Sequence, residues 1–66
     1  MKFKCRLKVI LAERDIKHGD FAKQIGVSKS TMSALINSKQ VPSFEVAYRI
    51  VELLGMRIEE IWVKEE

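Results

Sequence analysis

The sequence is poor in the residues that hold small folds together through covalent bonds or metals. Cys5 is the only cysteine and His18 the only histidine among 66 residues. An internal disulfide is therefore excluded, and one Cys with one His cannot supply the four ligands of an ordinary zinc site. A domain of this size buries only about 60% of the surface of its unfolded chain. We therefore expect a marginal core that gains from a second chain, with no metal and no other cofactor.

Long hydrophobic runs are also missing. No stretch reaches the length needed to span a membrane, and the basic start "MKFKCRLK" is not followed by the apolar segment of a secretory signal. A single thiol fits a reducing compartment. The sequence thus predicts a soluble, cytoplasmic protein without a membrane partner.

The side-chain sets that perform catalysis are absent from the sequence as well. It has no evident nucleophile with a neighbouring base and no phosphate-binding glycine loop. Glu59 and Glu60 are adjacent carboxylates, but neighbouring side chains on a helix point in different directions. We therefore predict that the protein is not an enzyme.

Charge is present but unevenly distributed. The net charge is +3, which divides into +6 for residues 1–49 (ten Lys/Arg, four Asp/Glu) and −3 for residues 50–66 (two Lys/Arg, five Asp/Glu). A basic body with an acidic end favours a polyanionic partner for the first part only. Ordinary surface solubility explains the same charges equally well, so charge alone does not decide.

The few turn-forming residues stand at regular intervals. Gly19, Gly26, Pro42, Gly55 and the pair Asn37-Ser38 divide the chain into five short pieces, whose apolar residues recur at helical spacing. No long alternating run and no hairpin signal is present. We therefore predict a single all-α domain over residues 1–66. The end segments "KFKC" and "WVKE" could nevertheless pair as short strands and bring the termini together.

The central stretch "FAKQIGVSKSTMSALINSK" predicts a helix-turn-helix over about residues 18–37. Only about three residues, 26–28, separate two helices, which suits a near-perpendicular crossing. Gly26 can adopt the positive φ that the turn needs, and Ser28 can cap the second helix through the backbone N–H of Thr31. Ala22 and Met32 are placed to fill the crossing.

The remaining side of the second helix is short, polar and free of acidic residues. It consists of Lys29, Ser30, Ser33, Ala34 and Asn37. Such a face fits the major groove of DNA, where side chains near the N-terminal end of a helix reach base edges. The simpler alternative is a solvated face of a small helical bundle. Lys29 is the strongest candidate for a base contact, and because Ser30, Ser33 and Ala34 are short and offer no bidentate contact, direct readout should be sparse.

Several segments together resemble the lambda-repressor-like (Cro/Xre-type) helix-turn-helix family, in order and spacing and without gaps. They are "LKVILAERDI", "FAKQIGVSKSTMSALIN", "PSFEVAYRIVELLG" and "IEEIW". The resemblance implies a compact five-helix DNA-binding domain with the recognition helix at about 29–37. It also implies a homodimer on a palindromic operator in double-stranded DNA, usually acting as a repressor.

The same resemblance assigns DNA-binding positions. His18 occupies a phosphate-contacting site at the start of the first helix of the pair, and Lys29, Ser30 and Ala34 occupy the base-reading sites. Thr31 and Ser33 flank these, while Asn37, Lys39 and Gln40 stand where the family grips phosphates. Three positions depart from the family pattern: Lys17 and Arg57 replace small polar helix caps, and Ser38 replaces a glycine after the recognition helix.

The C-terminal segment has two interpretations. Ile61, Trp62 and Val63 could cap the core, or they could form the dimer interface, which we favour because the core is small and Trp buries a large area. An alternative function on the same fold is an antitoxin or other protein-interaction module whose C-terminal segment binds a partner protein. The sparse base-reading face keeps this alternative open.

Overall fold

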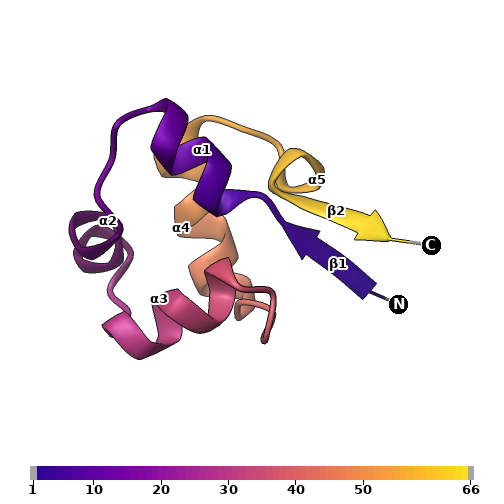
Figure 1. The fold of residues 1–66 in the computed structure, drawn as a ribbon, viewed down its shortest axis with the longest axis horizontal. Helices are drawn as coiled ribbons and strands as arrows, with labels where there is room; N and C mark the ends of the chain where they lie inside the picture. The colour runs from indigo at the N-terminus through magenta and orange to yellow at the C-terminus, as the bar shows by residue number, and fades with distance from the viewer. Residues whose placement is uncertain (1, 66) are drawn as a thin grey trace.

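The computed structural model describes residues 2–65. One short strand precedes the five helices and a second short strand follows them (Figure 1). The elements are β1 (Lys2–Cys5), α1 (Leu7–Glu13), α2 (His18–Ile25), α3 (Lys29–Ile36), α4 (Phe44–Leu54), α5 (Ile58–Ile61) and β2 (Trp62–Glu65). All five predicted helical pieces form. The longest has 11 residues, and no helix of this region is long and apolar enough to cross a bilayer.

The two strands correct the strictly all-α prediction. β1 pairs with β2 in an antiparallel ladder that runs from Lys2 opposite Glu65 to Cys5 opposite Trp62. The fold is therefore predominantly helical with a small sheet, and the pairing of "KFKC" with "WVKE" is confirmed. Only Cys5 and Trp62 in these strands are buried. With one inward pair, the strands are too short to show the alternation that identifies a half-buried strand.

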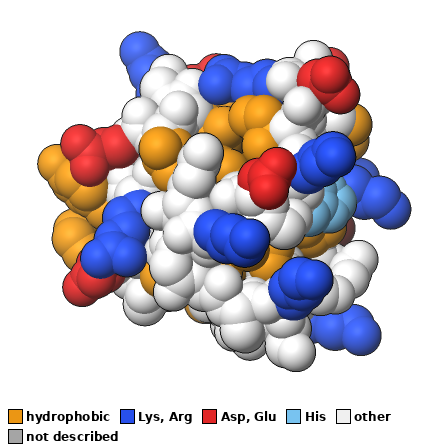
Figure 2. Space-filling view, turned by 90° about the vertical axis from the view of Figure 1, so that its left-hand side faces the viewer, with side chains coloured by type: hydrophobic (Ala, Val, Ile, Leu, Met, Phe, Trp, Pro, Cys, Tyr) orange, Lys and Arg blue, Asp and Glu red, His pale blue; other side chains and the backbone are white. Residues whose placement is uncertain are grey.

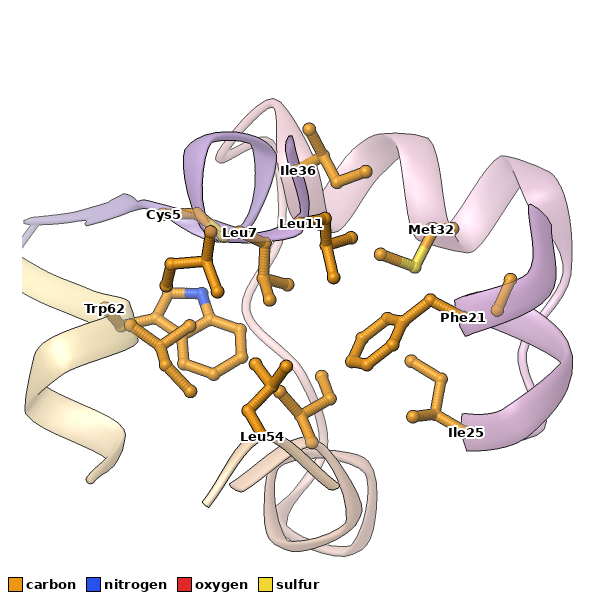
Figure 3. Packing of buried hydrophobic residues seen from close by; sticks show 13 residues of the cluster. Cys5, Leu7, Leu11, Phe21, Ile25, Met32, Ile36, Leu54 and Trp62 are labelled. Atoms are coloured by element: carbon orange, nitrogen blue, oxygen red, sulfur yellow. The ribbon is translucent and has the colours of Figure 1, made fainter. Parts of the chain in front are cut away.

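The core is built from one buried stripe of each helix and closed by the sheet. Phe21 lies at one end beside Ile25 and Met32, and Trp62, the first residue of β2, lies at the other end (Figure 3). Burial raises the pKa of the Cys5 thiol, which keeps it a small, unreactive apolar group. The buried indole N–H of Trp62 donates to no protein atom among residues 2–65.

Four helices end in a residue with left-handed backbone conformation. Glycine takes this position after α2 and α4, at Gly26 (φ 75°) and Gly55 (φ 64°), whereas Asp15 (φ 57°) and Ser38 (φ 60°) take it after α1 and α3. A side chain in this region costs about 1–2 kcal/mol. Ser38 recovers part of that cost, because its Oγ accepts a hydrogen bond of 2.9 Å from the backbone N–H of Cys5.

Charged side chains form hydrogen bonds at the end of α4 and at the start of α5. Arg14 donates to the carbonyl of Leu54 at the end of α4 (2.8 Å). At α5, the side chain of Arg57 has no acceptor atom, so the cap works in one direction only: Glu60 Oε1 accepts from the backbone N–H of Arg57 (2.9 Å). The unusual cap therefore does not prevent α5 from forming.

Candidate nucleic-acid interface

The turn between α2 and α3 has the conformation that its sequence predicts. Gly26 adopts φ 75° and ψ 35°, and the N–H of Val27 donates to the carbonyl of Ala22 at 3.0 Å. This is a Schellman ending, in which a left-handed residue lets the chain turn back on the helix that it leaves. The half-buried Val27 packs against the core, so the direction of the turn is fixed by packing as well as by hydrogen bonds.

The start of α3 and the helix crossing are also as predicted. Ser28 Oγ accepts from the backbone N–H of Thr31 and donates to Thr31 Oγ1, both at 3.1 Å. Ala22 and Met32, the residues expected in the crossing, are each only 2% exposed. Figure 1 shows α2 almost end-on and α3 from the side, so the two helices lie crosswise.

This geometry gives the turn a testable energetic signature. Alanine at position 26 would place its Cβ 3.0 Å from Arg49 Nη1, whereas nothing lies within 4 Å of a Cβ at position 55. Both Gly26→Ala and Gly55→Ala should lose about 1–2 kcal/mol of unfolding free energy from the left-handed backbone. Gly26→Ala should lose up to about 1 kcal/mol more, because Arg49 Nη1 must shift and its hydrogen bond to the carbonyl of Ile25 is weakened. Urea unfolding of the two variants measures the difference, and equal losses would contradict this account of the turn.

One side of α3 is open to solvent along its length. Lys29, Ser30, Ser33 and Asn37 are exposed, and Thr31 and Ala34 are partly exposed. Asn37 Nδ2 donates to Ser33 Oγ at 3.3 Å, which aligns these two polar side chains along the helix. The predicted base-reading positions are therefore accessible rather than covered by the rest of the chain.

A hollow of about 430 Å³ lies between α1, α2 and α3. Apolar side chains form its floor, and its polar rim is made by Lys8, His18, Lys29, Ser33 and Asn37. Figure 2 shows the side of the molecule on which α2 and α3 lie, where Lys and Arg side chains are spread and the single histidine stands among them. The structure thus brings four of the predicted positions together around one concave surface.

Lys8 is a member of this rim that the sequence reasoning missed. It lies on α1, outside the helix-turn-helix, and joins the rim only because α1 packs beside α2 and α3. Its one available signal is its position next to the buried Leu7 and three residues before the buried Leu11. A lysine next to the buried side of a helix can lay its aliphatic part along the neighbouring helices and keep its charge in water.

The start of α2 presents backbone donors to the same rim. Lys17 stands at the cap position in an extended conformation, and no side chain caps the helix there. The first intrahelical hydrogen bond recorded at this end joins the N–H of Phe21 to the carbonyl of Lys17 (3.0 Å). N–H groups in the first turn of a helix point outward and attract anions. His18 and Gly19 line the hollow, so a phosphate there would meet backbone donors and lysines together.

The remaining predicted positions lie beyond the hollow or inside the core. Lys39 and Gln40 are exposed in the loop after α3. No Asp or Glu occurs between Asp20 and Glu45, whereas Lys23, Lys29 and Lys39 fall within that span. In the predicted dimer interface, Ile61 is 0% exposed and Trp62 7% exposed, so both pack inside the single chain, and Val63 alone is accessible (39%).

A sharply bent helix pair that exposes a basic, acid-free helix face defines a helix-turn-helix protein of the nucleic-acid-binding class. A family model for the Cro/C1-type HTH DNA-binding domain matches residues 6–65. The chain belongs to this family, as its resemblance indicated.

Relatives in archaea share this domain over almost their whole length. An uncharacterized HTH-type transcriptional regulator of Methanocaldococcus jannaschii is 35% identical over 63 residues, covering 96% of each chain. Two uncharacterized HTH-type transcriptional regulators of Archaeoglobus fulgidus are 31% and 29% identical. Those alignments cover 92% and 88% of this chain, and 86% and 83% of the relatives.

Proposed function

We propose that this protein is a cytoplasmic transcriptional repressor that binds a palindromic operator as a homodimer. In this proposal α3 lies in the major groove, and the rim of the hollow follows the phosphate backbone. The observation that carries it is the exposed face of α3, which stands beside two lysines and the uncapped start of α2. The two copies would bind half-sites about 34 Å apart, one helical turn of DNA.

The side chains of α3 indicate how such a protein would choose its operator. Lys29 can donate to guanine O6 and N7, and Ala34 can touch a thymine methyl group. Ser30 and Ser33 are short and make no bidentate contact. Affinity would therefore depend mainly on phosphate contacts, from Lys8 and Lys29 on the rim as well as from His18, Asn37, Lys39 and Gln40. Discrimination between sequences would come partly from DNA shape.

A protein-interaction module, such as an antitoxin, is the second candidate function. The observation that favours it is an exposed apolar surface around the start of α4, separate from the exposed side of α3, where the Phe44 side chain is 84% exposed. A DNA-binding protein can carry such a surface for its own dimer, so this feature does not exclude the repressor.

Selection from random double-stranded DNA distinguishes the two candidates. We expect repeated enrichment of one palindrome with half-sites one helical turn apart, because a two-fold dimer imposes its symmetry on the operator. The recovered sequence should then bind the wild-type chain in a mobility-shift assay. Absence of any enrichment, even at low salt, would reject the repressor and leave the interaction module.

A further inference from the structure

Exposed apolar side chains gather on the side of the molecule formed by β1, the loop before α4, α4 and α5. Five large hydrophobic residues contribute to it: Phe3, Val41, Phe44, Tyr48 and Ile58. We call these five residues the Phe44 face. Phe44 is 84% exposed and Tyr48 58%, and their rings lie 6.3 Å apart between centroids. Soluble monomers seldom expose such a cluster unless it binds something.

The Phe44 face has both a ridge and hollows. A hollow of about 340 Å³ lies on one side of Phe44, lined also by Phe3, Pro42, Ala47 and Trp62. A second hollow, of about 230 Å³, is lined by Phe44 together with Tyr48, Val51 and Ile58. Phe44 therefore stands between two apolar hollows. A two-fold interface needs a surface that is complementary to itself, since both copies present the same patch.

From this shape we propose that the Phe44 face is the contact surface for a second copy of the chain, with Phe44 of each copy seated in a hollow of the other. The inference rests on the homodimer of the proposed function and assigns its surface. It replaces the predicted interface at 61–63, because Ile61 and Trp62 are already packed in the core of one chain. Trp62 contributes only as the floor of the larger hollow.

The exposed area is of the size that a dimer needs. If an aromatic side chain can bury about 200 Å², the exposed parts of Phe3, Phe44 and Tyr48 amount to roughly 350 Å². Val41 (64% exposed) and Ile58 (48%) add to this apolar centre. A stable interface buries about 800 Å² per partner, of which the rim is polar. Glu59, which is exposed and lines the larger hollow, supplies part of such a rim.

The position of the Phe44 face also suits a dimer on DNA. The loop of residues 37–43 leads directly from the end of α3 to Phe44 at the start of α4. It carries Lys39 and Gln40 on the way and contributes Val41 and Pro42 to the face. The contact surface therefore adjoins the end of the recognition helix without covering its exposed side, so two copies could dock and leave both α3 helices free.

The test is the oligomeric state of the full chain and of Phe44→Glu, measured by sedimentation equilibrium over a range of concentrations. Because Phe44 is almost fully exposed, the variant should keep the circular dichroism spectrum of the wild type. The wild type should show a monomer–dimer equilibrium, and Phe44→Glu should raise its dissociation constant at least about 30-fold, as expected for an interface hot spot. Leu53→Glu is the matched control, since Leu53 lies on α4, is 48% exposed and lies outside the face; it should leave the equilibrium unchanged.

The outcomes separate this inference from the proposed function. Phe44→Glu that dimerises like the wild type, or a wild type that stays monomeric with and without its selected DNA, would overturn the Phe44 face as a self-contact. A wild type that dimerises through Phe44 but enriches no DNA would retain the interface and reject the repressor. If the repressor function and the Phe44 interface are both correct, Phe44→Glu should bind a single half-site as the wild-type monomer does. It should also lose cooperative binding to the palindrome.

Discussion

Raising the salt concentration from about 50 to about 200 mM is expected to weaken operator binding by roughly a thousandfold. Each lysine that neutralises a phosphate releases a condensed counterion, and the logarithm of the affinity falls by about 0.9 per contact for each tenfold rise in salt. Lys8 and Lys29 border the hollow, and Lys39 is exposed in the loop beyond it. Six such contacts in a dimer predict a slope of about −5. Fluorescence anisotropy with the selected operator at several salt concentrations gives this slope, and a flat line would contradict the electrostatic account.

The same titration identifies the lysines that contribute. Lys29→Ala should make the slope shallower by about 2 for the dimer, one unit per copy, and should weaken binding about tenfold or more at fixed salt. Lys64→Ala removes the same charge from β2, where it pairs with Phe3 and lies beyond β1 from α3 (Figure 1). This control should change the slope little. Equal effects of the two substitutions would mean that net charge, and not the face of α3, determines the affinity.

Phe21→Ala is expected to remove about 3–5 kcal/mol of unfolding free energy, the usual cost of deleting a buried aromatic ring. Phe21 is only 1% exposed and belongs to the buried core, where it lies beside Ile25 and Met32 (Figure 3). At about 0.05–0.15 kcal/mol per residue, a chain of this length has a total stability of only about 3–10 kcal/mol. The variant should therefore lose a large part of its stability, which thermal and urea denaturation followed by circular dichroism would detect as a much lower midpoint.

Phe44→Ala provides the matched comparison for this core substitution. It deletes the same ring from a position that is 84% exposed, so the stability of the dilute monomer should change by less than about 0.5 kcal/mol. Similar losses in the two variants would show that the described core does not hold the fold together.

The ends of helices could be predicted from the sequence where a glycine stands at the end. Gly26 and Gly55 indicated where α2 and α4 end, because glycine adopts positive φ at little cost. Asp15 and Ser38 take the same conformation, but their residue types do not require it. At Ser38 the reason is tertiary: its hydroxyl accepts from Cys5, 33 residues earlier in the chain. Contacts between such distant residues leave no local pattern.

The candidate site also contains residues that local sequence predicts and residues that only tertiary packing places there. The face of α3 follows from helical spacing, which places Lys29, Ser33 and Asn37 on one side. Lys8 reaches the rim only through the packing of α1 against the helix pair, and no spacing rule within one helix contains that information. Ile61 and Trp62 were assigned to an interface because the core was expected to be small. Both side chains instead belong to the core of the single chain, where Trp62 pairs with Cys5 of β1.

The hydrogen bond between Ser38 Oγ and the N–H of Cys5 joins two parts of the surface that the proposals assign to different partners. The loop that begins at Ser38 carries Lys39 and Gln40 toward the operator, and β1 carries Phe3 toward a second copy. A displacement of the strand during docking would pull on the loop through this one hydroxyl. Without the Ser38 hydroxyl, dimerisation would no longer affect the position of the loop. The affinity for the operator would then no longer depend on whether the chain is dimeric through this contact.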